Sequence, residues 1–311
     1  NMSWLPTASL DALKQRAQFY AYIREFFTLR DVLEVETPLL SHAAVSDVNL
    51  YPLQARCNDK PVFLHTSPEY PMKRLLASGS GDIYQICKVF RDGESGSRHN
   101  PEFTMLEYYR LRFDLSTLMD EVAQLVGDFL NIQQRFDYSY QQAMTKFAGI
   151  DAFNSDDASL RARVTEFVGP DLELNRDACL DLIMSYVVEP SLPKNALVFI
   201  SAYPASQASL ANTYENATGH QVAKRFELYV NGLELANGYD ELVDVNEQKK
   251  RFEAEQSVHE TSRPMDQNFI DALAHGLPIC SGVALGLDRI LMLKLGAEHI
   301  DKVMSFNFEN C

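Results

Sequence analysis

An Asn-Gly pair at residues 231–232 constrains the fold more than any other feature of this chain. The pair lies between two apolar runs, and in that setting it is the strongest short signal for a two-residue β-hairpin turn. Such a turn sets Tyr229 opposite Glu234, and unbroken pairing then sets Glu227 opposite Ala236. One face of this hairpin is predicted to hold five apolar side chains: Phe226, Leu228, Val230, Leu233 and Leu235.

The other face of the hairpin carries two carboxylates, Glu227 and Glu234. They are diagonal neighbours with backbones about 7–8 Å apart, so their long side chains can converge on one cation. Mg²⁺ prefers one or two carboxylates together with substrate phosphates. The segment therefore indicates a magnesium site, although a solvated strand face explains it at least as well on its own.

Residues 83–111 are typical of two strands around a polar loop. In the second strand, Phe103, Met105, Glu107 and Tyr109 share one face because side chains alternate. A carboxylate and a phenol beside apolar neighbours can receive an ammonium group, since the acid supplies charge and the ring supplies an apolar wall. This face therefore predicts a binding site for an amine.

The loop between these two strands is rich in hydrogen-bond donors and poor in apolar side chains. Its polar residues include Arg91, Glu94, Arg98, His99 and Asn100. Arginine offers phosphate oxygens a planar fork of N–H groups, so the loop suits a triphosphate. A charged hairpin tip in water is the alternative interpretation of this segment taken alone.

Residues 279–295 are typical of a glycine-containing strand that leads into a helix. Glycine inside a strand often marks the close approach of a ligand or of another backbone, which applies here to Gly282 and Gly286. Arg289 falls in the first turn of the helix, where a cation is unfavourable beside the helix dipole. A phosphate nearby would relieve that repulsion.

Composition narrows the class of protein. Lys and Arg number 28 against 43 Asp and Glu, and the resulting net charge of −15 argues against a broad electrostatic grip on nucleic acid. No run of 18 apolar residues occurs, so no membrane helix is expected. The five cysteines form no CxxC pair and no secretory leader is recognised, so a cytoplasmic location is expected.

The pattern of elements predicts one α+β domain over residues 2–311, with helices interspersed among strands of a largely antiparallel sheet. No internal repeat or linker interrupts it. Asn1, which precedes a methionine, is interpreted as a tag remnant.

Taken together, these segments resemble the catalytic domain of class II aminoacyl-tRNA synthetases, and most closely the lysyl branch. The three ordered motifs of that family match residues 31–40, 90–107 and 282–289, and two lysyl-type pocket segments match residues 66–70 and 232–242. The resemblance implies a six- to seven-stranded antiparallel sheet flanked by helices, and a homodimer. It also implies that an aminoacyl-adenylate is made from ATP with Mg²⁺.

The resemblance further implies roles for individual residues. Arg91 and Arg289 match the catalytic pair that clamps the α- and γ-phosphates, and Phe103 matches the residue that stacks on adenine. The implied ATP-binding residues are Arg91, Asp92, Gly93, Glu94, His99, Asn100, Phe103, Glu234, Leu235, Gly286 and Arg289. The implied amino-acid-binding residues are Ser67, Pro68, Glu69, Glu107, Tyr109, Glu241 and Ala284. The implied metal ligands are Glu227 and Glu234.

Several features differ from an enzyme that charges tRNA. From the motif positions we expect no anticodon-binding domain, and the net charge argues against a general hold on tRNA. Ala284 replaces a usual glycine, and we expect its methyl group to disfavour an α-amine and to tolerate a shifted one. Gly93 replaces a usual acid, so any contact with ATP there is expected from the backbone alone.

With the segment 204–210 and the motif 280–286, these changes resemble the elongation factor P–(R)-β-lysine ligases of bacteria. That resemblance implies activation of (R)-β-lysine and its transfer to a lysine ε-amine of elongation factor P. Two alternatives stay open. One is a minimal lysyl-tRNA synthetase core that acts on α-lysine, and the other is a non-catalytic regulatory paralogue. The retention of Arg91, Arg289 and both metal acids argues against the second.

Overall fold

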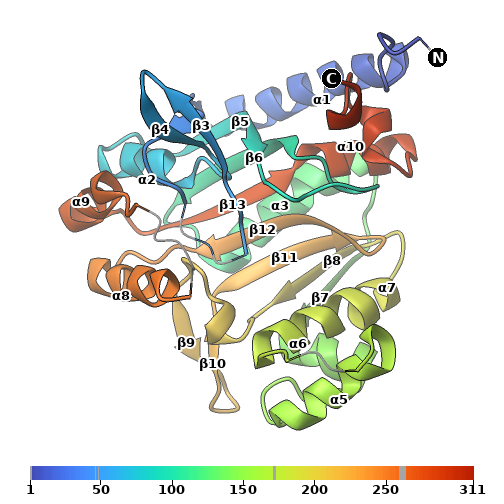
Figure 1. Ribbon diagram of the computed structural model, residues 1–311, viewed down its shortest axis with the longest axis vertical. Helices are drawn as coiled ribbons and strands as arrows, with labels where there is room; N and C mark the ends of the chain where they lie inside the picture. The colour runs from blue at the N-terminus through green and yellow to red at the C-terminus, as the bar shows by residue number, and fades with distance from the viewer. Residues whose placement is uncertain (1, 46, 48, 171–172, 259–263) are drawn as a thin grey trace. The chain divides into compact units, whose positions relative to one another are not determined.

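The computed structural model describes residues 2–45, 47, 49–170, 173–258 and 264–311. The interpretation of Asn1 as a tag remnant therefore lies outside the described residues. The chain divides into two compact units (Figure 1). Unit 1 comprises residues 1–114 and 241–311, and unit 2 comprises residues 115–240.

Four strands form the sheet of unit 1, in the order β1, β5, β6, β13. Strand β1 runs parallel to β5, and the other neighbours are antiparallel. The bounds of these strands are Leu33–Glu34 (β1), Ile83–Phe90 (β5), Glu102–Leu111 (β6) and Cys280–Gly286 (β13). The predicted pair of strands within residues 83–111 is therefore confirmed, and β13 is the glycine-containing strand that leads into a helix.

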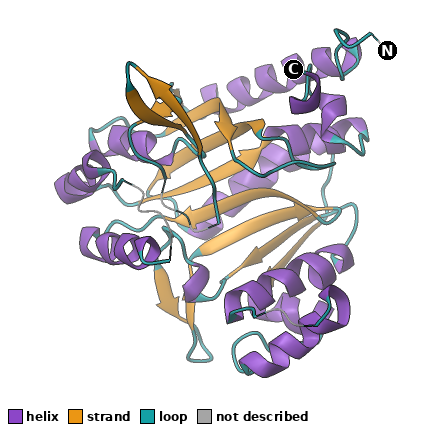
Figure 2. Ribbon diagram, in the orientation of Figure 1, coloured by secondary structure: helices purple, strands orange, loops and turns teal. Residues whose placement is uncertain are grey.

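Unit 1 also contains helices, which precede or follow these strands along the chain (Figure 2). Their bounds are Leu10–Thr28 (α1), Glu69–Ala77 (α2), Val245–Gln256 (α8), Gln267–Gly276 (α9) and Leu287–Leu295 (α10). A small separate sheet has the order β2 (Leu40–Ser41), β4 (Lys60–Leu64), β3 (Leu53–Cys57). Helix α1 begins where the Ser9 side chain accepts a hydrogen bond from the backbone of Ala12, and Phe27 near its end stacks on Tyr84 of β5 with ring centroids 4.5 Å apart.

Four further strands form the main sheet of unit 2, in the order β12, β11, β8, β7. Their bounds are Arg135–Ser139 (β7), Leu197–Ser201 (β8), Arg225–Val230 (β11) and Leu233–Asp240 (β12). Strands β7 and β8 are parallel, whereas the other neighbours are antiparallel. Helix α3 (Leu115–Leu130) precedes β7, and a short hairpin is formed by β9 (Thr213–Glu215) and β10 (Gln221–Ala223).

A group of helices between β7 and β8 forms the rest of unit 2. It comprises α4 (Tyr140–Ala143), α5 (Asp157–Val168), α6 (Arg176–Ile183), α7 (Glu189–Ser191) and π-helical turns at Met144–Ala148 and Met184–Val188. Its apolar residues, among them Leu160 and Leu180, pack into one buried cluster with Val198 of β8 and Tyr229 of β11. These helices therefore complete the core of unit 2.

The α+β class is confirmed, with two corrections. Eight strands occur in the main sheets of the described residues, where six or seven were predicted. The turn at residues 231–232 is confirmed, with Tyr229 opposite Glu234, but the pairing beyond it is not continuous. A β-bulge between Leu228 and Tyr229 sets Glu227 opposite Asn237 instead of Ala236, because one extra residue on β12 shifts the register.

Candidate active site

Glu107 is the centre of the predicted amine-binding face in unit 1. It lies in β6, opposite Gln85 of β5 and Ala284 of β13, and is 4% exposed. The Ser67 hydroxyl donates a hydrogen bond to its Oε1 over 2.9 Å, and the Tyr109 hydroxyl donates to its Oε2 over 2.8 Å. The structure therefore brings three other predicted amino-acid-binding residues, Ser67, Tyr109 and Ala284, next to Glu107.

The surroundings of Glu107 favour its neutral form. Burial, and secondarily the charge of Glu69, raise the pKa of the Glu107 carboxyl to about 8. Burial and the neighbouring Glu107 also raise the pKa of the Tyr109 phenol well above its usual value. A cation placed against Glu107 would restore its charged form, so the pocket is suited to an ammonium group.

Lys73 is a second buried charge in this region, and sequence reasoning missed it. Its Nζ lies 3.0 Å from Oε1 of Glu69 and 2.6 Å from Oε2 of Glu241, and the residue is 1% exposed. Burial alone would lower the pKa of Lys73, but the carboxylates of Glu241 and Glu69 raise it above its usual value. The available signal was the spacing of Glu69 and Lys73 four residues apart, which on most helices marks a solvent-exposed pair.

Gly282 of β13 allows these groups to approach closely. A Cβ atom built at this position would overlap the Tyr109 ring and would stand 2.7 Å from Oε1 of Glu241. The requirement for glycine is therefore one of space, as the sequence predicted for a strand glycine near a ligand.

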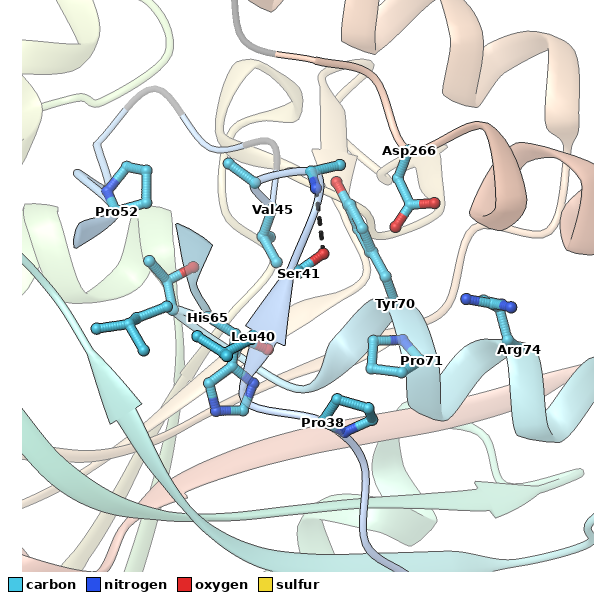
Figure 3. A pocket seen from close by; sticks show the side chains of 15 residues that line it. Pro38, Leu40, Ser41, Val45, Pro52, His65, Tyr70, Pro71, Arg74 and Asp266 are labelled. Carbon is cyan, nitrogen blue, oxygen red and sulfur yellow. Dashed lines mark hydrogen bonds between the residues drawn. The ribbon is translucent and has the colours of Figure 1, made fainter. Parts of the chain in front are cut away.

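A pocket of about 110 Å³ lies beside the loop that carries Ser67 (Figure 3). Thr66 and Ser67 line it together with residues 38–45 and helix α2, from which Tyr70 and Arg74 contribute. Figure 3 shows Tyr70 extending from α2 toward Val45. The residue that donates to Glu107 is thus also part of the pocket wall.

Arg91 lies at the end of β5, next to Phe103 at the start of β6. Its guanidinium is 5.1 Å from the centre of the Phe103 ring, and its Nη2 donates to the Thr66 carbonyl over 3.5 Å. Its Nε is buried and has no hydrogen-bond partner within the described parts of the chain. A buried N–H of this kind is a favourable position for a phosphate oxygen.

Arg289 in the first turn of α10 contacts the same loop. Its Nη2 lies 2.9 Å from Nε2 of His99, and its Nε donates to the Arg98 carbonyl over 3.3 Å. Burial and the charge of Arg289 lower the pKa of His99, so the neutral ring accepts the hydrogen bond. Arg289 of α10 therefore meets His99 in the same loop that begins with Arg91.

Asn100 has a different environment from the rest of this loop. It is 8% exposed, its Nδ2 donates to the Glu102 carbonyl over 2.6 Å, and its Oδ1 accepts from the backbone of Phe308 over 3.0 Å. These bonds give Asn100 a structural part in joining the loop to residues 308–310.

The other predicted residues fall around these groups. In unit 1, Asp92 and Gly93 are exposed, and Glu94 is half-buried. Pro68 directly precedes α2, and Gly286 directly precedes α10. Leu235 is buried in β12 of unit 2.

Glu227 of unit 2 is held by a hydrogen-bond network that sequence reasoning missed. Arg225 donates to its Oε1 over 2.8 Å, and the hydroxyls of Tyr203 and Tyr229 donate to its Oε2 over 2.8 and 2.5 Å. Arg225 also donates from Nε to the Asn237 side chain over 3.1 Å. The bulge is what brings Asn237 onto this polar face, so the alternation of residues alone could not reveal it.

The donor set of Glu227 and Glu234 fits a hard cation with few protein ligands. Three of the about four acceptor positions on the Glu227 carboxylate are taken by the network, which leaves room for one metal–oxygen bond. Within the described ranges, no group of three or more His, Cys, Asp or Glu side chains is arranged to hold a metal. A metal held here would need further oxygens from a substrate, as Mg²⁺ commonly does.

The comparison with known proteins agrees with this arrangement. The family model of class II tRNA synthetases (D, K and N) matches residues 3–310. The chain belongs to this family. An elongation factor P–(R)-β-lysine ligase of Pectobacterium carotovorum subsp. carotovorum (strain PC1) is 45% identical, with 99% of this chain and 98% of the relative aligned. The ligases of the same name from Yersinia enterocolitica (47% identical; 98% and 97% aligned) and Salmonella paratyphi B (46%; 99% and 98%) are also similar.

The family match confirms the predicted synthetase resemblance and the α+β class. It does not test the individual site residues, which stay predictions supported by the geometry above. No helix within the described ranges is long and apolar enough to cross a membrane.

Proposed function

We propose that this protein is an ATP-dependent ligase that activates (R)-β-lysine as its adenylate and transfers it to a lysine ε-amine of elongation factor P. The observation that carries the proposal is the buried Glu107, which receives hydrogen bonds from Ser67 and Tyr109 and has no cationic partner among the residues that the structure describes. The names of relatives at 45–47% identity support (R)-β-lysine as the amino acid and elongation factor P as the acceptor.

The reaction follows from the residues of unit 1. Glu107 and Tyr109 bind the terminal ammonium, and Glu69 and Glu241 line the amino-acid pocket around the substrate. Arg91 and Arg289 hold the phosphates of ATP, so that the substrate carboxylate attacks the α-phosphorus and pyrophosphate leaves. The acceptor ε-amine, once it has lost a proton, attacks the adenylate carbonyl, an amide bond forms, and AMP leaves.

We also propose that Mg²⁺ is the metal of this reaction and that Glu227 and Glu234 are its protein ligands. When bound, the ion would neutralise phosphate charge. The chain's own residues hold the Glu227 carboxylate in position. Arg225 offsets its charge, and the hydroxyls of Tyr203 and Tyr229 fix its orientation.

We further infer a single catalytic domain, because one family model covers residues of both units. A homodimer is supported by large apolar side chains exposed in unit 1: Leu10, Leu29, Leu33 and Ile279 are 57–75% exposed. A cytoplasmic location follows from the acceptor, which is a translation factor, and agrees with cysteines that are not paired in disulfides.

The intact mass of elongation factor P tests this function. The factor would be incubated with this protein, ATP, Mg²⁺ and either α-lysine or (R)-β-lysine, with bulk tRNA as a parallel acceptor. One added lysyl mass, formed faster with (R)-β-lysine, is the expected result. Charged tRNA beside an unmodified factor would indicate a minimal lysyl-tRNA synthetase instead, and no product together with no pyrophosphate exchange would indicate a non-catalytic paralogue.

The Ala284→Gly variant tests the proposed preference between lysine isomers. Ala284 lies opposite Glu107 in the sheet, so its methyl group shares the face of the amine pocket. Removal of the methyl group should raise activation of α-lysine relative to (R)-β-lysine. An unchanged ratio would show that Ala284 does not set the preference.

A further inference from the structure

Lys73 joins two carboxylates that come from distant parts of the sequence. Glu69 is one helical turn before Lys73 on α2, whereas Glu241 is anchored by its backbone N–H, which donates to the Cys280 carbonyl of β13 over 3.1 Å. The Lys73 ammonium contacts one oxygen of each acid, at 3.0 and 2.6 Å. The separation of the two carboxylates is therefore set by the reach of a single ammonium group.

The packing around α2 leaves Lys73 little freedom to move. Its Nζ lies 5.9 Å from the centre of the Phe269 ring of α9, and Tyr70 on the same helix stacks on Phe269 with ring centroids 4.2 Å apart. Lys73 is 1% exposed, so water does not compete for its hydrogen bonds. An ammonium group that is buried, charged and held on three sides is a rigid spacer rather than a surface ion pair.

The acids on either side of Lys73 are the two that the proposed function places in the amino-acid pocket beside Glu107. Glu69 and Glu241 stand at amino-acid-binding positions, and Oε1 of Glu241 lies against Gly282 and the Tyr109 ring of the amine pocket. The internal ammonium neutralises one of the three negative charges that Glu69, Glu107 and Glu241 can carry. A ligand with two ammonium groups brings two positive charges, which match the other two negative charges.

We propose that Lys73 is a positioning residue that fixes the spacing of Glu69 and Glu241, and that this spacing selects substrates by the number of carbons between their two amino groups. The proposal rests on the proposed function, which places both acids in the amino-acid pocket. It takes Glu241, beside Tyr109, as an acid that faces the terminal ammonium together with Glu107, and Glu69 as the acid that faces the other amino group. (R)-β-Lysine has four carbons between its amino groups, whereas α-lysine has five. Selection by spacing is thus distinct from selection by the position of the carboxylate, to which Ala284 was assigned.

Four substrates separate the two kinds of selection. α-Ornithine and (R)-β-lysine have four carbons between the amino groups, and α-lysine and 3,7-diaminoheptanoic acid have five. In each pair the first compound carries an α-amine and the second carries a β-amine. The readout is kcat/KM for amino-acid-dependent ATP–pyrophosphate exchange, compared between four and five carbons at a fixed carboxylate position.

The wild-type protein should prefer (R)-β-lysine to 3,7-diaminoheptanoic acid by at least tenfold. Lys73→Met should reduce that ratio to about threefold or less. Lys73→Arg keeps the charge but changes the reach of the side chain, so it should also reduce the ratio. The KM for ATP should stay within about twofold of the wild-type value in both variants. Ala284→Gly is the matched control, because it should change the ratio of α- to β-substrates and leave the spacing ratio intact. Equal losses with all four substrates in both Lys73 variants would overturn the proposal and leave Lys73 a purely structural residue.

Direct binding keeps the test decisive if a variant folds poorly or if no amino acid is activated. Calorimetric titration of the wild-type protein and Lys73→Arg with putrescine (four carbons) and cadaverine (five) reads the spacing without ATP. Tighter binding of putrescine that is lost in Lys73→Arg supports the proposal, even if absent pyrophosphate exchange has refuted the proposed function. Equal binding of the two diamines by the wild-type protein would refute the spacing role.

Discussion

Replacement of Glu107 by Gln should remove a pH dependence that the wild-type protein shows in amino-acid activation. In the empty pocket, burial and the charge of Glu69 raise the pKa of the Glu107 carboxyl to about 8. An ammonium group stabilises the charged form, so binding of the substrate lowers this pKa and releases a proton. Affinity for the amino acid therefore rises with pH until Glu107 is ionised before binding.

The size of the effect follows from the pKa of about 8. At pH 7 only about one molecule in eleven has Glu107 ionised, and the cost of removing the proton is about 1.4 kcal/mol at pH 7 and about 2.7 kcal/mol at pH 6. kcat/KM for (R)-β-lysine should therefore rise about tenfold from pH 6 to 7 and about fivefold from pH 7 to 8, and then level off. The substrate's terminal amine, with a pKa of about 10.4, stays charged over this range.

ATP–pyrophosphate exchange between pH 6 and 9 measures this slope. Glu107→Gln should lower kcat/KM at pH 8 by about 100-fold and should show no rise with pH, whereas Glu166→Gln, at an exposed site on α5, should keep the wild-type profile. Ser67→Ala removes a hydrogen bond that lowers the pKa of Glu107, so its profile should shift to higher pH. A flat wild-type profile between pH 6 and 8, or a slope that persists in Glu107→Gln, would refute the reasoning.

Three further substitutions test the packing of unit 1. Gly282→Ala should abolish amino-acid-dependent exchange while calorimetric binding of ATP is kept, because the new Cβ would overlap the Tyr109 ring. Asp288→Ala should lower the free energy of unfolding by about 3–5 kcal/mol in urea titration, because it removes a buried carboxylate that accepts from the backbone of Thr104 and leaves the half-buried guanidinium of Arg16, now 2.6 Å from Asp288, without its carboxylate partner. Phe27→Ala should cost about 3–5 kcal/mol in the same titration, since its ring is fully buried, and a loss below 1 kcal/mol would contradict the packing described here.

The parts of the site that lie on regular strands could be predicted from the sequence. Strand alternation placed Glu107 and Tyr109 on one face, and the structure shows them hydrogen-bonded to each other. The Asn-Gly turn was also found, because the left-handed backbone it needs at Asn231, with φ of 51°, is one that few residues adopt. In both cases a local rule determines the geometry.

Features that depend on contacts between distant segments were not predictable in this way. Lys73 looks like an ordinary surface lysine until the fold brings Glu241 to it from 168 positions later in the chain. The network at Glu227 needs Tyr203, from a loop 24 residues earlier, and a bulge that no alternation rule detects. Such groups are found only once tertiary packing has buried them and removed the water that would otherwise satisfy them.

Strand β6 explains why the amine pocket and the phosphate-binding loop can serve one substrate. Phe103 and Glu107 lie on the same face of β6, four residues apart, so about 13 Å of strand separates the arginine-rich end from the amine-binding carboxyl. The path from an α-phosphorus through the carboxylate to the terminal nitrogen of a lysyl-adenylate has eight bonds and extends roughly 10 Å. The Arg91 guanidinium lies 5.1 Å from the Phe103 ring at one end of that interval and Glu107 stands at the other end, so the two lengths are of the same order. A diamino acid with a shorter chain between its carboxylate and its terminal amine would lose one contact or the other. This length, which α-lysine and (R)-β-lysine share, is therefore a requirement separate from the spacing of the two amino groups.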